Sequence, residues 1–158
     1  FGTPAWPWFT AFMGDSRFSA SNWPSLPARV NVDDPAHPIA KDIPPLVVEG
    51  PDEGELLIVG WGSTYGSIVQ AREKAAAEGC SVAHVHLRHL NPLPPDLGDI
   101  LKRYKTALVP ELNLGQLSRL LREHYLLDVV QLNKVQGKPF KVSEIYDRIV
   151  ELCQGAQS

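Results

Sequence analysis

The sequence predicts an α/β protein in which a mainly parallel sheet is covered by helices on both faces. Its 158 residues correspond to one domain. The apolar share of 44% is that of a globular protein with one buried core. From residue 55 onward, apolar runs of strand length alternate four times with helical segments. Such alternation is typical of parallel strands joined by helices that pack on the sheet.

The predicted strands are short apolar runs that end at glycine, proline or polar residues. The run at 55–60 is continuously apolar, which is typical of a strand buried on both faces. Strands are predicted in the same way at 45–49, 81–87, 106–109 and 128–132.

Predicted helices follow the last four strands. Ser63 or Thr64 is expected to cap the first, which runs to residue 78. Prolines at 94–95 open the second, whose apolar residues keep amphipathic spacing: Leu97, Ile100, Leu101 and Tyr104. The third ends near Tyr125, and its apolar face is predicted to comprise Leu114, Leu117, Leu120 and Leu121. Ser143 is expected to cap the last, with these residues facing inward: Ile145, Ile149 and Leu152.

The composition divides the chain into three parts: an irregular leader at 1–38, a linker with an edge strand at 39–54, and an α/β domain at 55–158. Nine of the 14 prolines lie within residues 1–51, and proline discourages helix formation. The leader is also rich in aromatic residues. It is either an arm that docks on a partner or a foreign, poorly ordered segment, and the second interpretation is favoured.

Charge, hydropathy and cysteine content exclude several classes of protein. The net charge of -3 argues against a broad basic surface for nucleic acid. No apolar run reaches the length of a membrane span. Two cysteines cannot form a disulfide framework or a four-cysteine metal site, so we expect a reducing, cytoplasmic location. Because the chain starts at Phe1, we expect a processed form or a fragment.

Four polar loops follow the predicted parallel strands, at 60–66, 88–94, 110–116 and 133–139. The carboxyl ends of parallel strands meet at one edge of a sheet, where ligands and partners bind. The sequence therefore predicts an interface at this edge. Its candidate residues are Trp61, Ser63, Thr64, Tyr65, Arg88, His89, Asn91, Glu111, Asn113, Gln116, Asn133, Lys134 and Gln136.

The first loop invites comparison with a dinucleotide-binding turn. Its glycines are Gly60, Gly62 and Gly66. Three residues separate the second glycine from the third, whereas the dinucleotide-binding motif has two. The next strand ends in Arg88 and His89, where that motif needs an acidic residue for the ribose. Nucleotide binding at this edge is therefore the less favoured alternative.

The histidines and acids define no reaction centre. His84 and His86 share one face of a strand, but no carboxylate or cysteine lies nearby to complete a metal site. We expect them to be hydrogen-bonded beneath a helix or at a subunit contact. Glu111 is interpreted as a partner-facing anchor rather than a general base, because no second catalytic group is evident. No catalytic residue and no metal ligand is predicted.

Four loop motifs, at 57–66, 86–94, 109–117 and 132–140, occur in the order found in one enzyme family. Over about residues 39–152, the chain resembles the C-terminal region of the alpha subunit of 2-oxoacid:ferredoxin oxidoreductases, most closely the 2-oxoglutarate type. The resemblance implies a three-layer, transketolase C-terminal-like domain whose five-stranded sheet has one antiparallel strand, at 46–49. Residues 1–38 do not share the resemblance.

The resemblance also implies a function. The family complex oxidatively decarboxylates a 2-oxoacid to an acyl-CoA and reduces ferredoxin. Thiamine diphosphate, Mg²⁺, an iron–sulfur cluster and CoA belong to the complex, and none is expected on this chain, which alone should be inactive. The expected partners are the beta subunit and a missing pyrimidine-binding domain, with ferredoxin reached through the complex. The alternative is a stand-alone module that binds a nucleotide or CoA at the same edge.

Overall fold

The computed structural model of the chain describes residues 43–155, so the predicted leader at 1–38 lies outside the described residues. The strands are β1 (Val48–Glu49), β2 (Gly54–Trp61), β3 (Val82–Leu87), β4 (Tyr104–Glu111) and β5 (Val130–Asn133). The helices are η1 (Gly62–Thr64), α3 (Tyr65–Ala77), α4 (Leu97–Leu101), α5 (Gln116–Tyr125) and α6 (Val142–Gly155).

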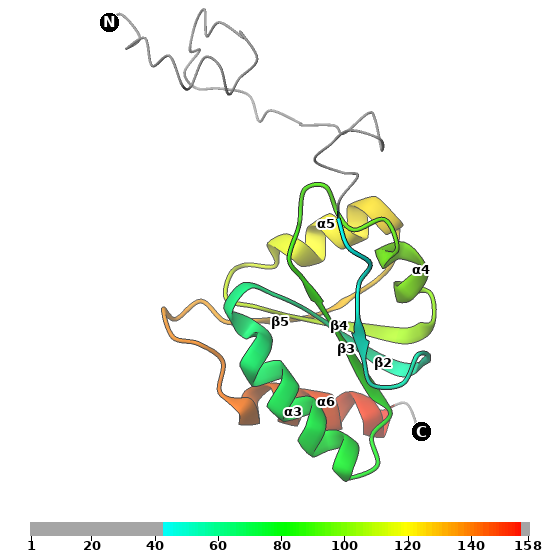
Figure 1. Cartoon of the computed structure of the whole chain (residues 1–158). Helices are drawn as coiled ribbons and strands as arrows, with labels where there is room; N and C mark the ends of the chain where they lie inside the picture. Colours follow the sequence, from blue (N-terminus) through cyan, green and yellow to red (C-terminus); the bar gives the residue numbers. More distant parts are fainter. Residues whose placement is uncertain (1–42, 156–158) are drawn as a thin grey trace, which may run out of the picture. The chain divides into compact units, whose positions relative to one another are not determined.

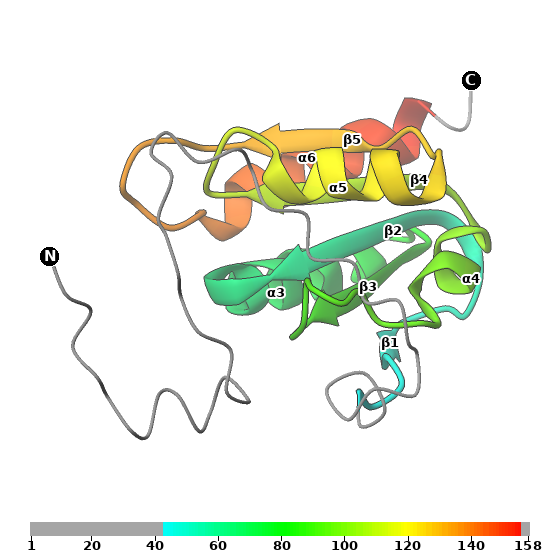
Figure 2. The same ribbon diagram turned by 90° about the horizontal axis from the view of Figure 1, so that it is seen from above.

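The described strands form a five-stranded sheet in the order β1-β3-β2-β4-β5, which Figure 2 shows from one edge to the other. β1 runs antiparallel to β3, with Val48 opposite Val85, and the other neighbouring pairs are parallel. The mainly parallel sheet and its antiparallel edge strand are therefore confirmed.

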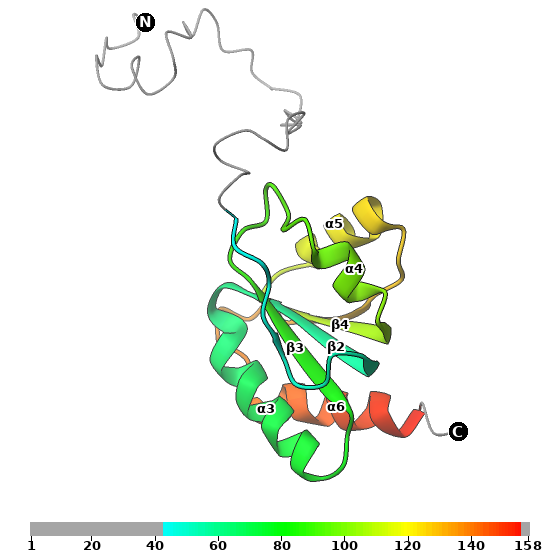
Figure 3. The ribbon, with the colours of Figure 1, turned by 45° about the vertical axis from the view of Figure 1, so that its right-hand side comes forward.

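Two helical layers cover the sheet. Figures 1 and 3 show α3 and α6 on one face and α4 and α5 on the other. β2 supplies both cores because successive side chains of a strand point to opposite faces. Leu57 and Val59 join the core beneath α4 and α5, whereas Leu56 and Ile58 join the core beneath α3 and α6. Burial of each such side chain contributes roughly 1.5–3 kcal/mol.

Two predicted helices are shorter than the apolar spacing suggested. Tyr104 is the first residue of β4 and not part of α4, which ends at Leu101. The chain turns at Lys102, and the Tyr104 hydroxyl then donates to the carbonyl of Pro51, 2.5 Å away. Leu114 precedes α5 and is 68% exposed, because Gly115 adopts a left-handed conformation with a φ of 83° and starts the helix after it.

The predicted cap of the last helix is also wrong. α6 begins at Val142, so Ser143 lies inside its first turn. The Glu144 carboxylate reaches back and accepts from the backbone N–H of Lys141 at 2.7 Å, which satisfies a donor just before the helix. Within residues 43–155, no helix is long and apolar enough to cross a membrane.

Candidate functional site

The structure brings all of the predicted interface residues to the carboxyl edge of the parallel strands. They lie at the last residues of the parallel strands, in the connections that follow β2, β3, β4 and β5, or at the first residues of the next helices. Most are exposed: Ser63, Tyr65, Arg88, His89, Asn91, Gln116, Asn133 and Gln136. Trp61, Asn113 and Lys134 are partly buried, and Thr64 and Glu111 are buried. The edge therefore has two groups of side chains, one exposed and one buried or partly buried.

Glu111 faces inward, so the prediction that it faces a partner is wrong. Its carboxylate is 0% exposed. It accepts from the backbone N–H groups of Leu117 at 2.7 Å and Ser118 at 3.1 Å, and from the Ser118 hydroxyl at 2.8 Å. These are N–H groups of the first turn of α5, which have no partner within the helix. A negative charge is also favourable at a helix N-terminus, so Glu111 holds α5 against the end of β4.

Two more predicted interface residues stabilise loops. The Asn113 side-chain oxygen accepts from the backbone N–H groups of Gly115 at 2.8 Å and of Gln116 at 2.9 Å. The Lys134 side chain is only 8% exposed and donates to Glu144 at 2.7 Å and to the Pro139 carbonyl at 3.0 Å. That hydrogen bond from Lys134 lowers the pKa of Glu144. Both contacts fix the course of the chain into the helix that follows.

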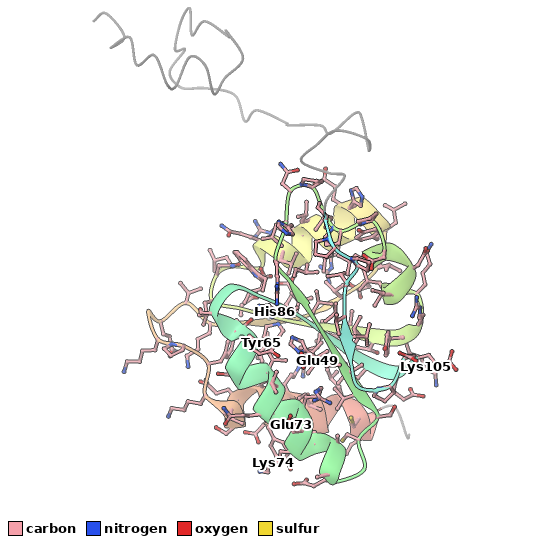
Figure 4. The ribbon with its side chains drawn as sticks, in the orientation of Figure 1. Glu49, Tyr65, Glu73, Lys74, His86 and Lys105 are labelled. Carbon is pink, nitrogen blue, oxygen red and sulfur yellow. The ribbon has the colours of Figure 1, made fainter. Side chains whose placement is uncertain are left out.

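Tyr65 links the first loop to the edge strand. It opens α3, is 45% exposed, and its hydroxyl donates to Glu49 at 2.8 Å. Its ring lies edge-on to that of His86, with the centroids 5.0 Å apart. Figure 4 shows Tyr65, Glu49 and His86 facing the same region of the molecule. The hydrogen bond to the Glu49 carboxylate raises the pKa of Tyr65.

His84 and His86 lie beneath α3, and each has one hydrogen-bonding contact, as predicted. His84 is 0% exposed, and its Nδ1 lies 3.5 Å from Glu49. Burial lowers the pKa of His84 to about 4, although the Glu49 carboxylate opposes the shift. His86 Nε2 lies 3.2 Å from the Gly62 carbonyl, so this nitrogen is the donor. Nε2 of His84 and Nδ1 of His86 are buried and have no hydrogen-bond partner among residues 43–155.

The sequence prediction missed Glu49, which contacts both Tyr65 and His84. It lies opposite His84 in the antiparallel register of β1 and β3, so the pair meets only when the edge strand is in place. The signal available in the sequence was an acid that directly follows an apolar strand pattern at the sheet edge. A two-residue strand gives no side-chain alternation from which to predict the register.

Two cavities lie at this edge. One, of about 360 Å³, lies between the segment before β1 and the loop after β3, and Tyr65, His86 and Arg88 contribute to its walls. The other, of about 330 Å³, lies between the first and third loops, where Trp61 and Gln116 line it. Among residues 43–155, no cluster of three or more histidines, cysteines or acids is arranged to hold a metal ion.

The fold and the arrangement of this edge define a class of domain. A split-gene transketolase matches the structure with a TM-score of 0.53 at 18% identity, covering 68% of this chain and 41% of the other. That likeness concerns the fold alone. The described residues form a three-layer, transketolase C-terminal-like domain, as the resemblance implied.

Sequence comparison identifies the relatives more closely. The chain is 50% identical over 104 residues to 2-oxoglutarate oxidoreductase subunit KorA of Mycobacterium tuberculosis. A 2-oxoglutarate:ferredoxin oxidoreductase from Magnetococcus marinus, solved with 2-oxoglutarate, coenzyme A and succinyl-CoA bound, matches with a TM-score of 0.69 at 30% identity. That match covers 73% of this chain and 21% of the other. No protein-family model matches the chain.

These matches relate the domain to the alpha subunits of 2-oxoacid:ferredoxin oxidoreductases, and the predicted resemblance is confirmed. The match to the mycobacterial subunit involves 65% of this chain and 16% of that subunit. The chain therefore spans about a sixth of the length of this curated relative.

Proposed function

We propose that residues 43–155 form a non-catalytic structural and subunit-interface domain of a 2-oxoacid:ferredoxin oxidoreductase alpha subunit, of the 2-oxoglutarate type. The identity of 50% to the mycobacterial subunit over 104 residues carries this proposal. The complex oxidatively decarboxylates a 2-oxoacid to an acyl-CoA, with electrons passing to ferredoxin. Thiamine diphosphate, Mg²⁺, the iron–sulfur cluster and CoA bind to other parts of that complex, which is cytoplasmic.

The contacts at the carboxyl edge support a scaffolding role. The buried polar groups there hold helices and loops in place: Glu111 anchors α5, and Lys134 ties the last loop to α6. Such contacts make the edge a preorganised surface, which lowers the cost of ordering loops when a partner binds.

The outward-facing residues of the same edge support subunit contact. Tyr65 opens α3, whereas Leu114 and Val135 lie in the loops before α5 and α6, and the three are 45%, 68% and 62% exposed. They lie among polar residues such as Arg88 and Gln136. Exposed aromatic, aliphatic and arginine side chains are typical of protein–protein interfaces. The proposed partners are the beta subunit and the pyrimidine-binding domain of the alpha subunit.

A chimeric alpha subunit tests the proposal. Residues 43–155 would replace the matching segment of the mycobacterial subunit, and the chimera would be co-expressed with its beta subunit. We expect a complex of normal size on gel filtration and 2-oxoglutarate-dependent reduction of ferredoxin. A subunit with the segment deleted is the control, and it should not assemble. A folded chimera that fails to join the beta subunit contradicts the proposal.

The alternative, a stand-alone module that binds a nucleotide or CoA, is supported by the two cavities of about 360 and 330 Å³ at the carboxyl edge. Thermal unfolding of the 158-residue chain with NAD, NADP, CoA and thiamine diphosphate separates the two proposals. A ligand that binds only the folded chain raises its Tm. An unchanged Tm with all four ligands favours the interface domain. A saturable rise in Tm with one ligand favours the alternative.

A further inference from the structure

The cavity beside β1 combines one apolar wall with one polar wall. The apolar wall is the extended segment 43–47, whose Val47 is 74% exposed. The polar wall is formed by Glu49, Tyr65 and His86, and the rest of the lining comprises Arg88, His89 and Pro94. At about 360 Å³, the cavity is large enough for one side chain and the backbone that carries it.

Both oxygens of the Glu49 carboxylate, which lines this cavity, already have contacts. One Glu49 oxygen accepts from the Tyr65 hydroxyl at 2.8 Å, and the other lies 3.5 Å from His84 Nδ1. The segment 43–47 is fixed as well, because the Leu46 N–H donates to Asp96 at 2.7 Å. Both walls are therefore held by internal contacts before any ligand arrives.

Arg88 adds hydrogen-bond donors to the lining of the cavity. Arg88 is exposed at the cavity and forms no ion pair or hydrogen bond with residues 43–155. A guanidinium group presents five N–H donors in a planar fork that matches the two oxygens of a carboxylate. The Glu49 carboxylate on the facing wall repels a doubly charged phosphate more strongly than a singly charged carboxylate. Charge complementarity therefore favours a carboxylate that approaches along the apolar wall.

We propose that this cavity receives an acidic side chain of the partner subunit, whose carboxylate pairs with Arg88 while its stem lies against residues 43–47. The inference rests on the proposed function, because the partner is the beta subunit of the complex. It assigns a specific anchoring contact to one corner of the carboxyl edge.

Association of the chimeric alpha subunit with the beta subunit, measured at low and high salt, tests this inference. Arg88→Gln should raise the Kd at least about tenfold, because one partner of a desolvated charge pair is lost. Arg88→Lys should restore part of the affinity, since it keeps the charge but not the fork. Arg119→Gln, an exposed arginine of α5, is the matched control and should bind like the parent.

A titration identifies the occupant. NMR spectra of the isotopically labelled 158-residue chain would be followed with glutarate and with inorganic phosphate as probes. Weak shifts at the cavity with glutarate, and smaller ones with phosphate, support a carboxylate partner. Tight, saturable binding of phosphate identifies a small-anion site and overturns the proposal. An unchanged Kd for a folded Arg88→Gln variant also overturns it, whereas a parent chimera that does not assemble overturns the proposed function as well.

Discussion

The carboxyl edge of the sheet has two halves whose polar loops make different contacts. In the β4–β5 half, comprising the loops at 111–116 and 133–139, two charged side chains turn inward, those of Glu111 and Lys134. The Glu111 carboxylate accepts from Leu117 and Ser118, and Lys134 is buried against Glu144. Glu111 thereby satisfies N–H donors that α5 leaves unpaired at its start, and Lys134 holds the Glu144 carboxylate in the first turn of α6.

In the β2–β3 half, comprising the loops at 61–65 and 88–94, several polar groups are exposed or have no hydrogen-bond partner among residues 43–155. Arg88 and His89 are exposed, and within residues 43–155 the buried His84 and the partly buried His86 each have one ring nitrogen without a hydrogen-bond partner. α3 needs no acidic residue at its start, because η1 leads into it and Thr64 bonds back to the Trp61 carbonyl at 2.8 Å. Loop composition alone therefore does not predict which polar residues turn inward. The unpaired N–H groups at the start of the following helix do predict it.

The largest expected effect is that of Glu111→Ala in the inward-facing half. The substitution leaves three buried donors without an acceptor and creates a cavity, so we expect a loss of about 3 kcal/mol in the free energy of unfolding. Urea denaturation followed by circular dichroism measures it. Gln116→Ala, an exposed change in the same helix turn, is the control and should cost less than about 0.5 kcal/mol. A Glu111→Ala variant as stable as that control would show that the buried carboxylate is dispensable.

Acid should destabilise the other half through His84. Burial lowers the pKa of His84 from 6.5 to about 4. Between these two pH values, His84 is therefore protonated in the unfolded chain and neutral in the folded chain. The resulting stability is complete above about pH 6.5 and is lost as the pH falls toward 4, by on the order of 3 kcal/mol in total. His84→Gln should flatten the profile of unfolding free energy in that range, and the exposed His89→Gln should leave it unchanged. Equal slopes in the parent and His84→Gln chains would contradict the assignment.

Gly60→Ala tests how tightly the histidine pair is packed. A Cβ atom there would lie 2.6 Å from Ile68 Cδ1, 2.9 Å from His86 Nδ1 and 3.1 Å from His84 Nε2. Overpacking of this kind typically costs about 1–3 kcal/mol. Gly66→Ala is the matched control, because a Cβ meets nothing within 4 Å and alanine favours the helix. The Tm should fall for the first variant and stay or rise for the second, and equal Tm values would show that the space at Gly60 adapts.

The sequence was sufficient to predict the sheet and the gathering of polar loops at one of its edges. The apolar run of β2 and the polar loops after each parallel strand carry that information, since burial and connectivity dictate both. The direction of individual side chains was not predictable, as Glu111 shows. Its role depends on three donors in Leu117 and Ser118, which come within reach only when α5 packs on β4. Glu49 was missed for a related reason, because its partner His84 lies on another strand.

The smallest expected effect on stability is that of Arg88→Gln. A small effect would distinguish the β2–β3 half of the edge from the β4–β5 half. Arg88 is exposed and forms no contact with residues 43–155 that the substitution would break, so the free energy of unfolding should change by less than about 0.5 kcal/mol. Lys134→Met, in contrast, breaks the contact with Glu144 and with the Pro139 carbonyl, so its Tm should fall measurably. Thermal unfolding of both variants compares the two halves directly. If Arg88→Gln lowered the Tm as much as Lys134→Met, Arg88 would be a structural residue, and its guanidinium would no longer be free for a partner.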